Sequence, residues 1–172
     1  MLWRPTIQTK RIGRYQYEES DKILSDINSK TINLCGITIR ESASIIKRSC
    51  LSIGVETVFV QIASALNVPN VVLLGGGFFG RFAPLSNLTS VACLPLECYG
   101  CKYECLYDTI YCVKSISENV IVQALNQSLD ERSDKIRLFI QDKSLWNPGI
   151  DQPKWKMSDL DKDKYQIIEI KN

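Results

Sequence analysis

The sequence contains no histidine among its 172 residues. A Ser-His-Asp or Cys-His catalytic group needs an imidazole to accept the proton of the nucleophile, so this chain alone forms neither group. The same absence excludes every zinc site that includes a histidine ligand. Any metal site in this chain therefore needs other ligands.

Long hydrophobic runs and a strong net charge are also missing. No window reaches the roughly 18 uninterrupted apolar residues of a membrane span, and the first residues, MLWRPTIQTKR, lack the apolar stretch of a signal peptide. We therefore expect no transmembrane segment and a cytoplasmic protein. The formal net charge of +2 is not the basic signature of nucleic-acid-binding proteins, so we expect no nucleic-acid partner.

The sequence does contain a regular alternation of helical spacing and short apolar runs. The expected strands are 31–36, 50–54 and 70–75, with KIRLFI and YQIIEI as two further candidates, and the expected helices are 18–29, one that begins after Thr38, 55–66 and 117–129. Residues 76–114 are expected to be irregular. This alternation predicts an α/β fold with a parallel sheet.

Two turns of this sheet are candidate ligand sites, because parallel α/β sheets bind ligands at the carboxyl ends of their strands. They are Gly54–Thr57 and Gly75–Gly80. In the first, a strand leads into a helix whose N-terminus presents free N–H groups and a positive dipole end, which suits a phosphate. The alternative is that Glu56 and Thr57 only cap that helix.

The order of these segments resembles glycosyltransferase family nine, the heptosyltransferases of lipopolysaccharide synthesis. The stretch NLCGITIRESASIIKRSCLSIGVETVFVQIASALNVPNVVLLGG, 33–76, is similar to the family's "nL-G-T-sl-E" helix, its "G-x-D/E-T/S-G-x-x-H-x-A" turn and its "a-l-x-v-P-x-v-x-l-f-G" strand. Residues 93–125 are similar to the cysteine-rich ending of some members. The resemblance covers about residues 31–129.

The resemblance implies the C-terminal half of a GT-B glycosyltransferase, a partial Rossmann-like sheet that holds a nucleotide sugar such as ADP-heptose. The acceptor, a lipopolysaccharide or a protein hydroxyl, and the catalytic base would belong to a missing N-terminal half or a partner subunit. The expected organisation is a lead-in and short helix over 1–30, the nucleotide-sugar-binding domain over 31–129, and a tail of unknown role over 130–172.

The resemblance also implies a set of donor-binding residues. They are Glu56, Thr57, Val58, Gln61 and Gly76. Two of them depart from the family pattern. Val58 replaces a glycine and restricts close backbone approach to a phosphate, and Gln61 replaces a histidine, so it hydrogen-bonds but cannot titrate.

The glycine turn Gly75–Gly80 also matches the G-x-G-x-x-G pattern of dinucleotide-binding proteins. That pattern requires a helix directly after the turn, and Pro84 argues against one here. An NAD or FAD site therefore stays a minor alternative beside a loop that shapes the donor pocket, or a plain turn.

Four of the seven cysteines follow the spacing C-x2-C-x3-C-x6-C, within the loop 93–112. They are Cys98, Cys101, Cys105 and Cys112. Four thiolates on a short irregular stretch suit a tetrahedral, structural zinc or iron ion. The alternatives are buried free thiols or adventitious disulfides. Cys35, Cys50 and Cys93 stand among apolar residues and are expected to be small core residues.

The sequence therefore leaves two functions open. The first is the donor-binding portion of a glycosyltransferase that transfers a sugar to a lipopolysaccharide or protein acceptor. The second is a non-catalytic interaction module that a metal ion stabilises.

Overall fold

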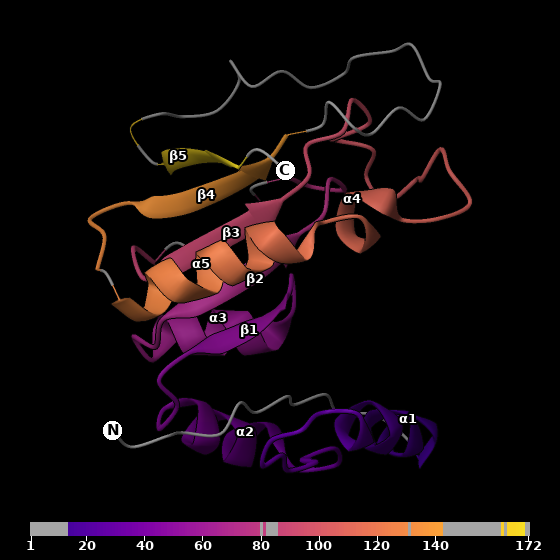
Figure 1. The fold of residues 1–172 in the computed structure, drawn as a ribbon, viewed down its shortest axis with the longest axis vertical. Coiled ribbons are helices and arrows are strands. Elements are labelled where there is room, and N and C mark those ends of the chain that lie inside the picture. The colour runs from indigo at the N-terminus through magenta and orange to yellow at the C-terminus, as the bar shows by residue number, and fades with distance from the viewer. Residues whose placement is uncertain are drawn as a thin grey trace.

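The computed structural model describes residues 14–79, 81, 86–130, 132–142, 163 and 165–170. Five strands form one sheet in the order β1-β2-β3-β4-β5, and each neighbouring pair is parallel (Figure 1). The strands are β1 (Ser52–Val55), β2 (Asn70–Leu74), β3 (Thr89–Cys93), β4 (Ile136–Gln141) and β5 (Tyr165–Ile170). The predicted α/β fold with a parallel sheet is confirmed, and it is consistent with a Rossmann-like arrangement.

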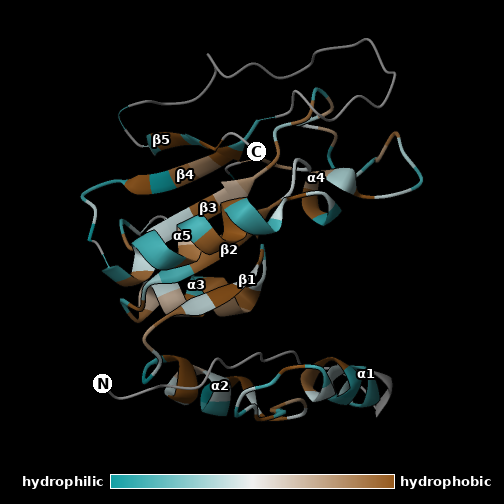
Figure 2. Cartoon of the chain, in the orientation of Figure 1, coloured by the Kyte–Doolittle hydropathy of each residue, from teal (hydrophilic) through white to brown (hydrophobic). Residues whose placement is uncertain are grey.

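The central strands are buried along nearly their whole length because both faces of the sheet are covered. Every residue of β3 and of β4 is buried. The register pairs Val72 with Val91 and Val91 with Leu138, so valines and leucines of neighbouring strands lie side by side. Figure 2 shows the strands largely in hydrophobic colours.

The helices are α1 (Arg14–Ser25), α2 (Ile39–Ile46), α3 (Val58–Ala65), the short α4 (Tyr111–Lys114) and α5 (Glu118–Asp130). The run Thr38-Ile39-Arg40-Glu41 has the sequence pattern of a capping box, and the structure confirms one at the start of α2. The Thr38 hydroxyl accepts the Glu41 N–H at 3.3 Å, and the Glu41 carboxylate accepts the Thr38 N–H at 2.7 Å. These bonds satisfy two N–H groups at the start of α2 and fix where the helix begins.

Two helices cover opposite faces of the sheet (Figure 1). On one face, Val120 and Ala124 of α5 pack on side chains such as Ala92 and Phe139. On the other face, Val60 of α3 packs against side chains such as Val91 and Leu138. These residues alternate along the strands with those that face α5. The helix α2 lies outside α3 and reaches it through a small separate cluster of Ile46, Ala63 and Val68.

Three local predictions were wrong. Residues 31–36 form no strand; the chain turns at Cys35–Gly36, where Gly36 has a φ of +91°, and Ile32 is 55% exposed. The strand β3 lies inside the segment that was expected to be irregular. The helical spacing of residues 117–129 predicts that Leu129 faces the core, but Leu129 is 54% exposed, because α5 turns Ser128 inward at its last turn instead.

The C-terminal segment contributes two strands to the sheet. KIRLFI and YQIIEI correspond to β4 and β5, so both candidate strands are confirmed. The sheet therefore continues past residue 130, where the nucleotide-sugar-binding domain was expected to end. Within the part of the chain that the structure describes, no helix is long and apolar enough to cross a membrane.

Candidate functional site

Both candidate turns lie at the carboxyl edge of the sheet, after the neighbouring strands β1 and β2. The strand order does not reverse, so the sheet has no switch point of the usual kind. The chain nevertheless diverges at this edge: it leaves β1 for α3 on one face and leaves β3 for α5 on the other. The glycine turn after β2 lies between these two departures.

Glu56 connects the two turns. Its Oε1 accepts the backbone N–H of Gly75 at 2.7 Å. Its Oε2 is buried and has no hydrogen-bond partner among the described residues. Burial raises the pKa of the Glu56 carboxyl, and the bond from Gly75 lowers it by a smaller amount. The side chain therefore fixes the distance between the two turns and does not cap α3.

Thr57 occupies the N-cap position of α3 with an extended backbone, φ −122° and ψ 172°, but its side chain makes no capping hydrogen bond. Val58 opens the helix and is 47% exposed, and Gln61 is exposed one turn later. These three predicted donor-binding residues thus lie on the solvent-facing start of α3. The alternative, in which the side chains of Glu56 and Thr57 only cap the helix, does not describe this geometry.

The glycine turn is packed against the cysteine-rich segment. The Gly76 carbonyl accepts the Gly100 N–H at 2.7 Å, and the Gly77 carbonyl accepts the Lys102 N–H at 2.9 Å. A Cβ atom at Gly76 would lie 2.2 Å from the Tyr99 ring, and one at Gly77 would lie 2.4 Å from the Tyr103 ring. These two glycines therefore make room for aromatic rings of the chain itself.

The element that follows the glycine turn bears on the alternative of an NAD or FAD site at Gly75–Gly80. No helix follows the turn in the described residues; the next element is β3. Gly80, the last glycine of the pattern, lies outside the described residues. The context that a dinucleotide loop needs is absent from this part of the chain.

The four spaced cysteines differ in exposure. Cys98 and Cys112 are each 9% exposed, Cys101 is half-buried and Cys105 is exposed. Burial raises the pKa of the Cys98 thiol to about 11, with smaller contributions from the charges of Cys101, Cys112 and Cys105. The Cys112 sulfur accepts the Gly76 N–H at 3.4 Å. Burial raises the pKa of Cys112, and this hydrogen bond opposes the rise.

These thiols do not form a ready-made metal site. All seven cysteines are free, and the described residues contain no group of three or more His, Cys, Asp or Glu side chains placed to hold a metal ion. The metal-binding loop expected from the spacing is therefore not shown as a preformed site.

The other three cysteines were expected to be core residues. Cys93 is fully buried in β3. Cys35 is half-buried and lies 3.3 Å from the Ser20 hydroxyl. Cys50 is exposed, so its assignment to the core was wrong.

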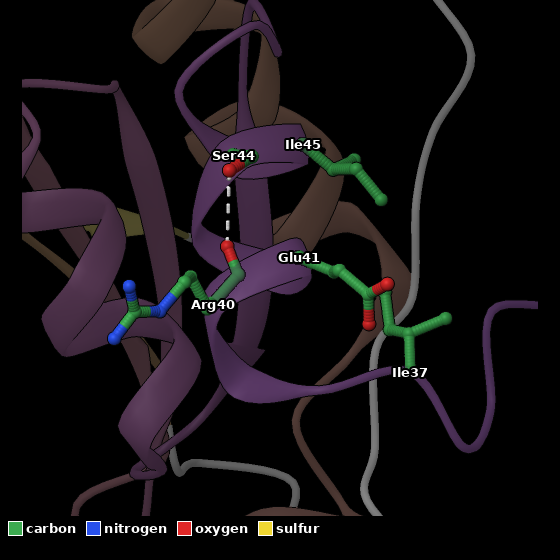
Figure 3. Close-up of a pocket in the computed structure, with 5 residues that line it drawn as sticks. All are labelled: Ile37, Arg40, Glu41, Ser44 and Ile45. Atoms are coloured by element: carbon green, nitrogen blue, oxygen red, sulfur yellow. Dashed lines mark hydrogen bonds between the residues drawn. The ribbon is translucent and has the colours of Figure 1, made fainter.

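A hollow of about 450 Å³ lies on α2, away from every predicted site residue (Figure 3). Its lining residues are Ile37, Arg40, Glu41, Ser44 and Ile45. The Glu41 carboxylate is already held in the capping box, and Ser44 donates to the Arg40 carbonyl at 3.0 Å. The Glu41 carboxylate and the Ser44 hydroxyl are therefore committed to the helix itself.

No local sequence pattern indicates the two tyrosines that cover the glycine turn. Tyr99 is 2% exposed and packs on Phe79 with ring centroids 5.0 Å apart. Tyr103 packs on Phe78 at 5.2 Å and is 61% exposed. Both stand between cysteines, and only the fold shows which glycines they meet.

Comparison of the chain with protein-family models, with curated proteins and with solved structures gave no match.

Proposed function

We propose that this chain is the donor-binding portion of a glycosyltransferase that takes a sugar, such as heptose from ADP-heptose, from a nucleotide sugar. One observation carries the proposal. The exposed start of α3, with Thr57 at its N-cap, lies at the carboxyl end of β1, and Glu56 links it to the glycine turn after β2.

The start of α3 suits the diphosphate of the donor. The first N–H groups of a helix have no partner within the helix, and the helix dipole favours an anion there. The Thr57 hydroxyl makes no capping bond, which leaves it available for a phosphate oxygen. The same groups would stabilise the charge that develops on the nucleoside diphosphate as it leaves.

Glu56 has a positioning role in this proposal. Its Oε1 already holds Gly75, and its Oε2 is buried, so the carboxylate fixes the two turns that flank the donor. The general base, and the lipopolysaccharide or protein acceptor, would come from another half of the enzyme or a partner subunit.

The test is titration of the chain with ADP-heptose and with ADP in a calorimeter. We expect Thr57→Ala to weaken donor binding about tenfold, the loss of one hydrogen bond to a charged group. Ser44→Ala on α2 is the matched control, because its hydroxyl bonds only within its own helix. Equal affinities for wild type and Thr57→Ala would remove Thr57 from the site, and no binding by the wild type would end the proposal.

A second candidate function is a metal-stabilised interaction module. It is favoured by the C-x2-C-x3-C-x6-C spacing of four free thiols and by the Gly76 N–H, which donates to the Cys112 sulfur. A zinc or iron ion held by four thiolates would replace a hydrophobic core in this loop. We expect a chelator to lower the melting temperature of the reduced protein. A melting temperature indifferent to chelators would argue against it.

A further inference from the structure

We propose that Tyr103, supported by Phe78 and Arg81, binds the nucleobase of the donor by stacking. We call these three residues the aromatic shelf. The inference rests on the donor-binding function proposed above and adds the part of the chain that recognises the base. The shelf lies at the Gly77 end of the glycine turn, whereas Glu56 holds the Gly75 end.

The aromatic shelf is a group of flat side chains that contact one another. The rings of Phe78 and Tyr103 meet edge to face, with centroids 5.2 Å apart and an angle of 71° between their planes. The guanidinium carbon of Arg81 lies 5.3 Å from the centroid of the Phe78 ring, a cation–π contact. Both are favoured arrangements of an aromatic ring, so Phe78 supports the other two side chains.

The ring of Tyr103 is placed by the chain itself, yet most of it faces solvent. The Lys102 N–H donates to the Gly77 carbonyl at 2.9 Å, which brings the next residue against the turn. A Cβ atom at Gly77 would lie 2.4 Å from the Tyr103 ring, so the ring rests on the Gly77 backbone. With these contacts made, Tyr103 is still 61% exposed. A ligand that stacks on this ring therefore meets a surface already in place, which reduces the entropy lost on binding.

The shelf and the proposed diphosphate site contact the same short turn. Glu56, the residue before the N-cap of α3, accepts the Gly75 N–H at 2.7 Å, and Tyr103 rests on Gly77. Only two peptide units join Gly75 to Gly77, so their Cα atoms are at most about 7.6 Å apart. A ligand whose diphosphate binds at the start of α3 can thus place its base on the shelf.

Of the three parts of a nucleotide sugar, the base is the one that suits the shelf. The base is flat and aromatic, and aromatic side chains stack on the face of any base. The diphosphate is matched by the N–H groups at the start of α3. The exposed charge of Arg81 adds an attraction for an anionic ligand on the same side of the turn.

The experiment titrates the full chain with ADP in a calorimeter and compares variants of Tyr103. We expect Tyr103→Ala to bind ADP about tenfold more weakly, as for the loss of one stacked base. Tyr103→Phe keeps the ring and should bind ADP as the wild type does. Tyr17→Ala is the matched control, because Tyr17 is 46% exposed but lies on α1, and it should leave the ADP affinity unchanged.

Two further measurements isolate the stacking contact. Gly77→Ala leaves Tyr103 in the chain but puts a Cβ atom where its ring lies, so we expect it to weaken ADP binding too. Inorganic pyrophosphate has no base, so the wild type and Tyr103→Ala should bind it equally when it competes with ADP. Circular dichroism should show the same folded spectrum for every variant.

The outcomes separate the shelf from the donor-binding function. If the wild type does not bind ADP, both are overturned. If the wild type binds ADP and Tyr103→Ala binds it equally well, the shelf is overturned and the donor-binding function stands. The shelf is also overturned if Tyr103→Phe is as weak as Tyr103→Ala, or if Tyr103→Ala weakens ADP-heptose but not ADP, because the ring would then contact the sugar.

Discussion

The carboxyl of Glu56 is held in a half-buried position that raises its pKa above the usual 4.5. The folded chain therefore holds the proton of Glu56 more tightly than the unfolded chain does. At neutral pH, Glu56 is charged in a site that desolvates it, which lowers the free energy of unfolding. This penalty disappears as the pH falls through the raised pKa toward 4.5, because the folded chain takes up the proton first.

We predict that this pH dependence is lost in Glu56→Gln. The glutamine oxygen still accepts the Gly75 N–H, but the side chain no longer titrates. As the pH is lowered from 7 to about 4.5, the free energy of unfolding of the wild type should rise relative to that of the variant. Urea denaturation of both proteins at several pH values measures the difference. A difference that stays constant with pH would contradict the raised pKa.

The two adjacent glycines Gly76 and Gly77 should respond differently to alanine. Each new Cβ would meet an aromatic ring, at 2.2 Å from Tyr99 and 2.4 Å from Tyr103. Tyr99 is buried and cannot withdraw, whereas Tyr103 is 61% exposed and can turn into solvent. We predict that Gly76→Ala lowers the free energy of unfolding by about 1–3 kcal/mol and that Gly77→Ala lowers it by clearly less. Denaturant titration compares the pair, and equal losses would contradict the difference in ring mobility.

Among the elements, α2 and α3 begin in contrasting ways. Thr38 caps α2 with its side chain as part of a capping box, whereas Thr57 stands at the same position of α3 without a capping bond. We predict that Thr38→Ala destabilises the chain by about 1 kcal/mol and that Thr57→Ala changes stability by only a few tenths. Thermal and urea unfolding of both variants test this. A comparable loss in Thr57→Ala would mean that its hydroxyl serves the helix and not a ligand.

The strands also show which elements of the fold could be predicted from local sequence patterns. The strands β2, β4 and β5 were predicted because continuous or alternating apolar residues leave few other choices. The strand β3 was missed because it begins with Thr89 and Ser90, two polar residues that are fully buried. Ser90 is buried because it accepts a hydrogen bond from Ser128 of α5 at 2.7 Å. Such a pairing between distant residues leaves no local signal.

The site itself was predictable only in part. The turn after β1 follows from the end of a strand and the start of a helix, both visible in the sequence. The link from Glu56 to Gly75 and the covering of the glycines by tyrosines join segments that are far apart in the chain. The spacing of the four cysteines suggests their proximity but not their different exposures, which depend on the packing of α4 and β3.

At the scale of the whole molecule, the C-terminal strands are part of the core. Every residue of β4 is buried, and its Arg137 donates to the Gln127 carbonyl near the end of α5 at 2.8 Å. We predict that a chain that ends at Asp130 loses cooperative thermal unfolding, because it exposes the edge of β3 and the underside of α5. Circular dichroism melting tests this. A sharp transition in the shortened chain would show that the first three strands fold without β4.

The placement of α3 and α5 on opposite faces has a consequence for the hand of the chain path. The parallel strands follow one another across the sheet in chain order, so the face that a helix covers determines the hand of its crossover. The two crossovers are therefore of opposite hand, although nearly all such connections are right-handed because strand twist directs the helix that follows. Between β1 and α3 the chain turns within two residues, Glu56 and Thr57, so the twist of β1 directs the path of α3. Residues 94–117 lie between β3 and α5. Because this cysteine-rich segment is long, the twist of β3 does not direct the path of α5.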